Sequence, residues 1–155
     1  MLISMRRILI RGTIIARRDL VEIELRYLDK RFRVSLDKSR CGVYIEDPGD
    51  TLRSDVPRIN LLSQDPCAIL IETDTRIMFL NLTRDSHEIL REIISVSRDI
   101  DILVITLSRD VYSVEFLAEL ARIIKASITI PISLDEEDFY LFRDLVNYYT
   151  QVIKL

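Results

Sequence analysis

Hydrophobic and polar positions alternate in the first part of the chain in the way that β-strands require. Every second residue is apolar over 21–27 and again over 32–36, with charged residues or serine between them. Successive side chains of a strand point to opposite faces of its sheet, so this pattern predicts a β-hairpin with one face in water. Stretches rich in β-branched residues predict two more strands, over 7–16 and 42–46.

From residue 68 onward, apolar runs of strand length alternate with helical patterns. The runs are typical of strands covered on both faces, and they lie at 68–72, 76–82, 102–107 and 128–132. Three segments with helical spacing follow serine or aspartate residues that can cap a helix, over 85–97, over 108–125 and from 133 nearly to the C-terminus.

The pattern also predicts which helical residues are buried. Phe116 and Ile123 widen the apolar stripe of the middle helix, which indicates a largely buried helix. The inward residues of the last helix are expected to be Phe139, Phe142, Val146, Tyr149 and Ile153.

These elements predict one α/β domain over residues 1–155. We expect an antiparallel meander in a β-rich part over 1–47, a loop over 48–66, and an α/β part over 67–155 that forms a mixed sheet with three helices. The loop is expected because three of the four prolines fall in it, with a helical turn near residues 60–62.

Composition narrows the chemistry that is available. The chain of 155 residues is 48% hydrophobic and 30% charged, which predicts a folded protein. Its three glycines do not stand at a strand-to-helix turn, where a phosphate-binding loop needs them. One histidine, together with Cys41 and Cys67, gives too few ligands for a zinc site, so buried thiols are the favoured interpretation and no cofactor is expected.

The same data suggest a setting for the protein. No apolar run is long enough to span a membrane, and the N-terminus lacks the pattern of a secretion signal, so a cytoplasmic protein without membrane contact is expected. The dominance of 18 arginines over four lysines and the scarcity of glycine suggest a heat-adapted, archaeal-like source.

Three acidic residues form the sharpest enzymatic candidate. Asp65, Glu72 and Asp74 flank a predicted strand and its turn, and carboxylates in such a place can hold a divalent cation that activates water. Residues 66–76 resemble the PD-(D/E)xK nucleases, although Asp74 stands where that family has lysine. The resemblance implies metal-dependent cleavage of nucleic acid. The simpler interpretation makes 73–75 a turn across which Glu72 pairs with Arg76.

Basic residues near the N-terminus suggest a second function. Residues 1–40 hold eleven Lys and Arg against five acids. Arginines on strands next to a tyrosine are used by sheet-based nucleic-acid binders. The candidates are Arg6, Arg7, Arg11, Arg17, Arg18, Arg31 and Arg33. Ion pairing with Glu22 and Glu24 is the alternative.

A third candidate lies where a predicted strand meets a helix, at Ser108, Arg109 and Asp110. The carboxyl ends of parallel strands are where open α/β sheets bind ligands. The stretch 102–126 also resembles a strand-Ser-Arg-helix segment of the Brix family of ribosome-assembly proteins, whose other half this chain lacks. That resemblance implies RNA contact.

No set of residues in the chain matches a complete catalytic motif, so the first hypothesis is an interaction or assembly module. It is expected to be an oligomer or a subunit of a larger complex. Tyr140, Tyr148 and Tyr149 are the candidates for a partner surface, because tyrosine is enriched in interfaces. Nucleic-acid binding and metal-dependent nuclease activity remain the alternatives.

Overall fold

The computed structural model describes most of the chain as ten strands and three helices. The described residues are 7–13, 20–27, 30–37, 41–46, 58–72, 75–108, 110–133 and 135–154. The chain divides into two compact units, residues 1–55 and residues 56–154, and each is taken here by itself.

The first unit is an antiparallel sheet of four strands in the order β1-β2-β3-β4. Its strands are β1 (Arg7–Thr13), β2 (Leu20–Tyr27), β3 (Lys30–Asp37) and β4 (Gly42–Glu46). Ile23 lies opposite Ile10 and Val34, whereas Glu24 lies opposite Arg33. The register thus pairs apolar positions with apolar ones and charged positions with charged ones, and the antiparallel strand order confirms the predicted meander.

The second unit has a six-stranded mixed sheet in the order β10-β9-β8-β7-β6-β5. Its strands are β5 (Arg58–Ser63), β6 (Cys67–Glu72), β7 (Arg76–Asn81), β8 (Ile102–Thr106), β9 (Ile128–Ile132) and β10 (Gln151–Val152). Pairing is antiparallel from β5 to β7 and parallel from β7 to β10. The fold is α/β.

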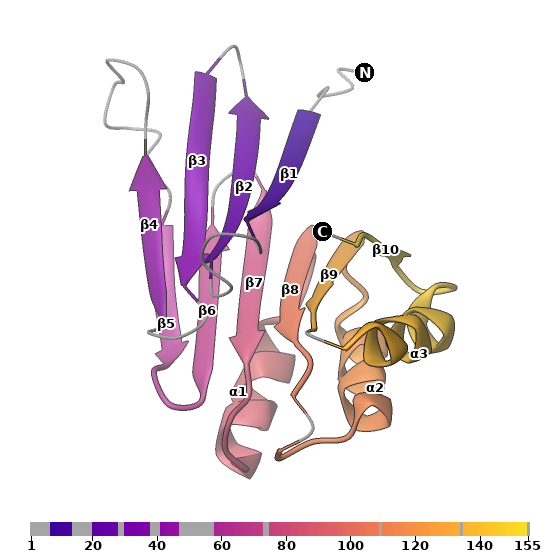
Figure 1. The fold of residues 1–155 in the computed structure, drawn as a ribbon. Helices are drawn as coiled ribbons and strands as arrows, with labels where there is room; N and C mark the ends of the chain where they lie inside the picture. The colour runs from indigo at the N-terminus through magenta and orange to yellow at the C-terminus, as the bar shows by residue number, and fades with distance from the viewer. Residues whose placement is uncertain are drawn as a thin grey trace. The chain divides into compact units, whose positions relative to one another are not determined.

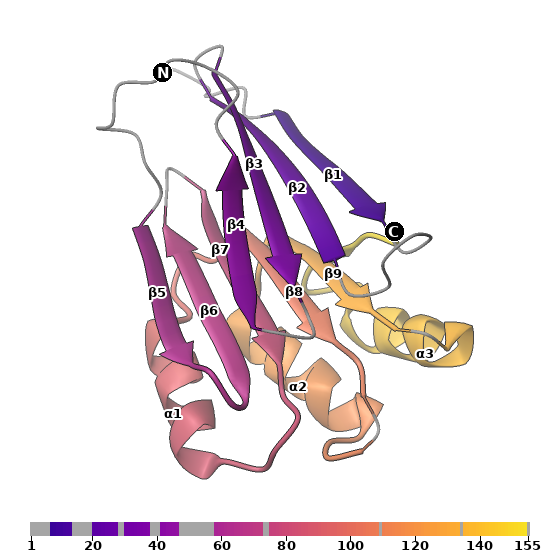
Figure 2. The same cartoon turned by 60° about the vertical axis from the view of Figure 1, so that its left-hand side comes forward.

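Each parallel pair of strands is joined through a helix. These are α1 (His87–Val96), α2 (Val114–Ile124) and α3 (Glu136–Val146). All three helices lie on one face of the six-stranded sheet, with α2 between the other two (Figure 1, Figure 2). This arrangement follows from right-handed crossovers that all progress in the same direction along the sheet.

A continuous apolar core fills the space between this sheet and its helices. Met78 and Leu103 from the strands meet Ile93 of α1, Leu117 of α2 and Phe142 of α3, and all five side chains are buried. Burying side chains of this size contributes about 1.5–3 kcal/mol each before the entropy of ordering is counted. The core thus holds the strand ends and the helix starts in fixed positions.

The helix starts differ from the expected caps by a few residues. Ser86 caps α1 by accepting a hydrogen bond from the Ile89 amide, and Ser113 does the same for α2 with the Phe116 amide. Asp135, rather than Ser133, caps α3. The predictions of Asp85, Ser108 and Ser133 as caps were wrong because each of those residues belongs to the loop that brings the chain out of its strand. Only the predicted starting points of the helices were wrong. The three helices themselves are confirmed.

Two predicted elements are wrong. The expected helical turn near residues 60–62 is part of β5, because the chain there pairs with β6 and pairing in a sheet overrides weak local preference. The last helix ends at Val146, and β10 then adds a parallel strand to β9. Thr150 and Val152 are β-branched and favour this extended segment, so Tyr149 is half exposed and not a core residue.

The two cysteines, Cys41 and Cys67, are both disulfide-bonded. The expectation of buried free thiols was wrong, because a count of cysteines along the sequence carries no information on which of them meet in space. No helix within the described part of the chain has the length and apolar content to cross a membrane.

Candidate functional site

The structure separates the acids of the proposed nuclease site. Asp65 lies in the turn before β6 and Glu72 ends that strand, so roughly 20 Å of extended chain lies between them. Glu72 forms an ion pair with Arg76 at 3.4 Å, which confirms the pairing expected across the turn. Asp74 falls outside the described residues.

Asp65 instead takes part in a small network at the carboxyl edge of the parallel strands. Its carboxylate accepts a hydrogen bond from Thr83 at 3.4 Å and pairs with Arg84 at 3.3 Å. Both partners follow β7. Among the described residues, no three His, Cys, Asp or Glu side chains are grouped so that they can bind a metal ion.

Two strand-to-helix loops meet at the same edge of the sheet. The Tyr112 hydroxyl, from the loop after β8, donates to Asp85 Oδ1 at 3.0 Å and accepts from the Ser86 amide at 3.4 Å, both in the loop after β7. Burial raises the pKa of Tyr112 above its ordinary value of 10.0; the Ser86 amide lowers it and Asp85 raises it further. Tyr112 is therefore a neutral tie between the loops.

The strand-to-helix junction at residues 108–110, which the sequence suggests as a ligand site, brings few reactive groups together. Ser108 donates to Asp110 at 3.3 Å, and Arg109 lies outside the described residues. Thr106, the last residue of β8, is 3% exposed, and its hydroxyl makes no hydrogen bond in the described part of the structure. His87 is exposed in the first turn of α1. These residues do not form a nucleophile with its base.

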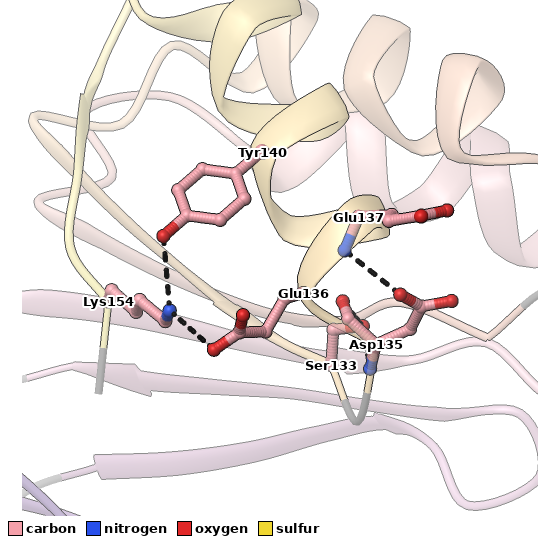
Figure 3. A network of polar contacts seen from close by, with 6 residues as sticks. All are labelled: Ser133, Asp135, Glu136, Glu137, Tyr140 and Lys154. Carbon is pink, nitrogen blue, oxygen red and sulfur yellow. Dashed lines mark hydrogen bonds and ion pairs between the residues drawn. The ribbon is translucent and has the colours of Figure 1, made fainter.

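The corner between β9 and α3 is polar and closed by local hydrogen bonds (Figure 3). Asp135 accepts from the Glu137 amide at 2.9 Å and its own amide donates to Ser133 at 3.1 Å. On the other side, Lys154 donates to Glu136 at 3.2 Å and to Tyr140 at 3.4 Å (Figure 3). Hydrogen bonds to Glu136 and Tyr140 raise the Lys154 pKa. The network fastens the chain end to the helix.

The three helices and the turn after α3 carry large exposed apolar side chains. We call this set the helical surface, and it consists of Ile94, Phe116, Ile123, Tyr140, Leu141, Tyr148 and Tyr149. Tyr148 is 92% exposed, and Tyr140 and Tyr149 are 40% and 50% exposed. All three tyrosines proposed from the sequence therefore reach solvent.

Sequence reasoning missed four members of the helical surface, and two of them, on α2, were expected in the core. Phe116 and Ile123 were expected to widen the buried stripe of α2, but they are 38% and 47% exposed. They stand seven positions apart, which is two helical turns, and so share an outward face of α2. The signal was present in Glu115 and Glu119, whose exposed positions mark the same side of the helix.

Cationic side chains accompany the tyrosines. Arg143 lies over the Tyr140 ring at 4.8 Å, and Arg122 of α2 lies over the Tyr149 ring at 5.9 Å. Lys154 is 5.0 Å from the Tyr140 ring. Such pairs contribute about 0.5–1 kcal/mol at exposed sites and hold the aromatic rings in place. Rings and guanidinium groups together make the kind of surface that is enriched in protein interfaces.

The strand register orders the basic residues of the first unit. Arg7 lies opposite Arg26, and Arg26 lies opposite Arg31, so three arginine positions form one cross-strand row. In the neighbouring rows each arginine position faces an acid: Arg11 is opposite Glu22, and Arg33 stands between Glu24 and Glu46.

Three of the proposed nucleic-acid residues are not described by the structure. Arg6, Arg17 and Arg18 fall outside the described residues. Among the candidate positions that the structure does describe, the row of Arg7, Arg26 and Arg31 is the one in which the strand register pairs no arginine with an acid.

No catalytic or metal-binding arrangement therefore emerges from the described residues, whereas an exposed apolar surface does. Comparison of the chain with protein-family models, with curated proteins and with solved structures finds no match.

Proposed function

We propose that this protein is an interaction and assembly module that binds other protein chains through its helical surface. The observation that carries the proposal is the concentration of large exposed apolar side chains on α2, α3 and the turn after α3. Scattered exposed apolar residues are ordinary on any protein, but a patch that contains aromatic rings and neighbouring arginines is typical of a binding surface.

The free energy of the aromatic side chains on this surface is lower when a partner protein covers them than when they are exposed to water. Aromatic side chains bury a large area with few rotatable bonds, so they lose little entropy when an interface orders them. The cations beside Tyr140 and Tyr149 restrict those rings before any partner arrives, which lowers the cost of binding further.

The proposal is tested by the size of the particle that contains this chain in a native extract. Gel filtration followed by detection of the chain should place it well above the 18.1 kDa of the monomer. Replacing Tyr140 and Tyr148 by serine should shift part of it to smaller size. Elution as a monomer from both the extract and the purified sample would contradict the proposal.

Nucleic-acid binding by the first unit is a second candidate, supported by the row of Arg7, Arg26 and Arg31. Three neighbouring arginines without opposing acids suit a phosphate backbone. Binding of single-stranded RNA should weaken steeply as salt rises, because counterions are released. Arg26→Glu should weaken it more than the matched control Arg33→Glu, since Arg33 already stands between two glutamates. Equal affinity of both variants and wild type would remove this candidate.

A further inference from the structure

The two ends of α2 carry opposite charges. Glu115 is exposed in its first turn and the exposed Lys125 caps its C-terminus, while Glu119 and Arg122 between them pair with each other. This polarity suits the helix dipole. It also makes α2 complementary to an antiparallel copy of itself, because the acidic end of each helix would lie beside the basic end of the other.

The two ends of α2 also differ in shape: an aromatic ring is exposed at one end and a pocket opens at the other. At the acidic end, the Phe116 ring stacks on Tyr112 with centroids 4.4 Å apart, and it is 38% exposed. At the basic end, a pocket of about 600 Å³ opens between the ends of α1 and α2. The exposed side chains of Ile94 and Ile123 line this pocket together with Arg98 and Lys125.

Two acidic residues also line the pocket, and one of them already accepts a hydrogen bond. Asp101 accepts a hydrogen bond from the Arg76 amide at 2.8 Å, and Asp99 is exposed beside Arg98. The pocket is therefore close to neutral overall, with apolar walls. A neutral aromatic ring suits it better than a small charged ligand does.

We infer that the helical surface binds a second copy of this chain, with α2 packed antiparallel to α2 of the partner about a two-fold axis. The axis passes near Glu119 and Leu120, midway between Phe116 and Ile123. Each Phe116 ring then enters the pocket beside Ile123 of the other copy, and each Glu115 approaches Lys125. This inference rests on the proposed assembly function and names its partner.

A second copy fits these observations better than an unrelated protein does. Both halves of each complementary pair occur on the same chain: Glu115 and Lys125 stand at the two ends of α2, and the ring of Phe116 and the pocket beside Ile123 lie two helical turns apart. A two-fold interface requires such self-complementarity, since the same patch is used on both subunits. An unrelated partner would need only one half of each pair.

The test is sedimentation equilibrium of the full chain and of surface variants. Wild type should give twice 18.1 kDa. Ile123→Glu should give the monomer, because it places a charge at the pocket wall. Ile59→Glu on the edge strand β5 is the matched control and should remain dimeric, since Ile59 is similarly exposed but lies outside the helical surface. Far-ultraviolet circular dichroism shows that each variant is folded.

Charge reversal gives a sharper test of the antiparallel arrangement. Glu115→Lys and Lys125→Glu should each weaken the dimer on the order of tenfold, because like charges then meet twice across the axis. An equimolar mixture of the two variants should dimerise as wild type does, since every Lys then faces a Glu.

Four outcomes would overturn the inference. A wild-type dimer that Ile123→Glu leaves intact, or charge-reversed variants that do not restore each other, would move the interface elsewhere and leave the assembly function standing. A purified monomer that elutes as a larger particle from the extract would do the same and point to a different protein as the partner. A monomer in both samples would end both proposals.

Discussion

The hydroxyl of Tyr112 donates to Asp85 across the gap between two strand-to-helix loops, at 3.0 Å. The same oxygen accepts from the Ser86 amide, so one side chain ties the start of α1 to the loop before α2. Tyr112→Phe should keep the stacking on Phe116 and lose both hydrogen bonds. We expect a loss of about 1 kcal/mol in the free energy of unfolding, measured with urea. Tyr148→Phe is the control and should change nothing, because that side chain is 92% exposed.

The raised pKa of Tyr112 gives a prediction about pH. The neutral hydroxyl makes the tie, and its folded pKa lies above the ordinary value of 10.0. The contribution of the tie to stability should therefore be fully present below about pH 10 and be lost as pH rises through the folded pKa. Asp85→Asn should lower the pKa of Tyr112 by removing a nearby negative charge. The pKa of Tyr112 is measured from the absorbance of tyrosinate as pH rises, and the Tyr112→Phe variant identifies which part of the signal comes from this residue. An unchanged titration in Asp85→Asn would contradict the hydrogen bond between Tyr112 and Asp85.

Thr106 should tolerate replacement by valine. Its buried hydroxyl has no hydrogen-bond partner within the described part of the structure, so the folded protein loses hydration of that group without compensation. Thr106→Val should leave stability unchanged or raise it by about 1 kcal/mol, whereas Thr106→Ser keeps the hydroxyl and loses a methyl group. Thermal unfolding of the two variants decides this. A large loss in Thr106→Val would mean that the hydroxyl is bonded.

Arg76 should matter more for stability than an ordinary surface arginine. Its guanidinium group donates to the Val96 carbonyl at 3.3 Å and to the Arg98 carbonyl, and it pairs with Glu72. These contacts fasten the end of α1 to the start of β7. Arg76→Ala should cost about 2 kcal/mol, and lysine should restore little of it because one ammonium cannot reproduce the planar fork. Arg143→Ala is the comparison, because the Arg143 guanidinium contacts its neighbour Asp144 and the Tyr140 ring. Equal losses in both would contradict the special role of Arg76.

The disulfide predicts the thiol content of the protein. Cys41 and Cys67 are the only cysteines, and both are bonded. Unfolding in denaturant without a reductant should expose no titratable thiol, whereas reduction should expose the thiols of both cysteines. Two free thiols in protein purified under air would contradict the bond.

Much of this fold was readable from hydrophobic periodicity. Alternation over 21–27 and 32–36 identified the meander, and the continuous apolar runs identified the buried strands, because burial on one or two faces leaves a different pattern in each case. Helix existence was likewise confirmed for α1, α2 and α3. The failures at β5 and β10 share a cause: both are edge strands whose structure depends on pairing with β6 and β9, which no local pattern encodes.

Only part of the helical surface could be predicted from the sequence. Tyr140, Tyr148 and Tyr149 were proposed from residue type, and the structure exposes them. Phe116 and Ile123 were assigned to the core because a helix packed on a sheet was expected to be covered more widely than it is. How far neighbouring helices cover α2 is a property of tertiary packing, and sequence periodicity does not report it.

The central claim is that this protein works by contact with other chains through its helical surface. Sedimentation velocity of the purified wild-type chain, over a hundredfold range of concentration, tests that claim most directly. The account predicts a dimer at high concentration, with twice the monomer mass of 18.1 kDa, that dissociates on dilution. A single species of 18.1 kDa at every concentration, together with elution as a monomer from the native extract, would contradict it.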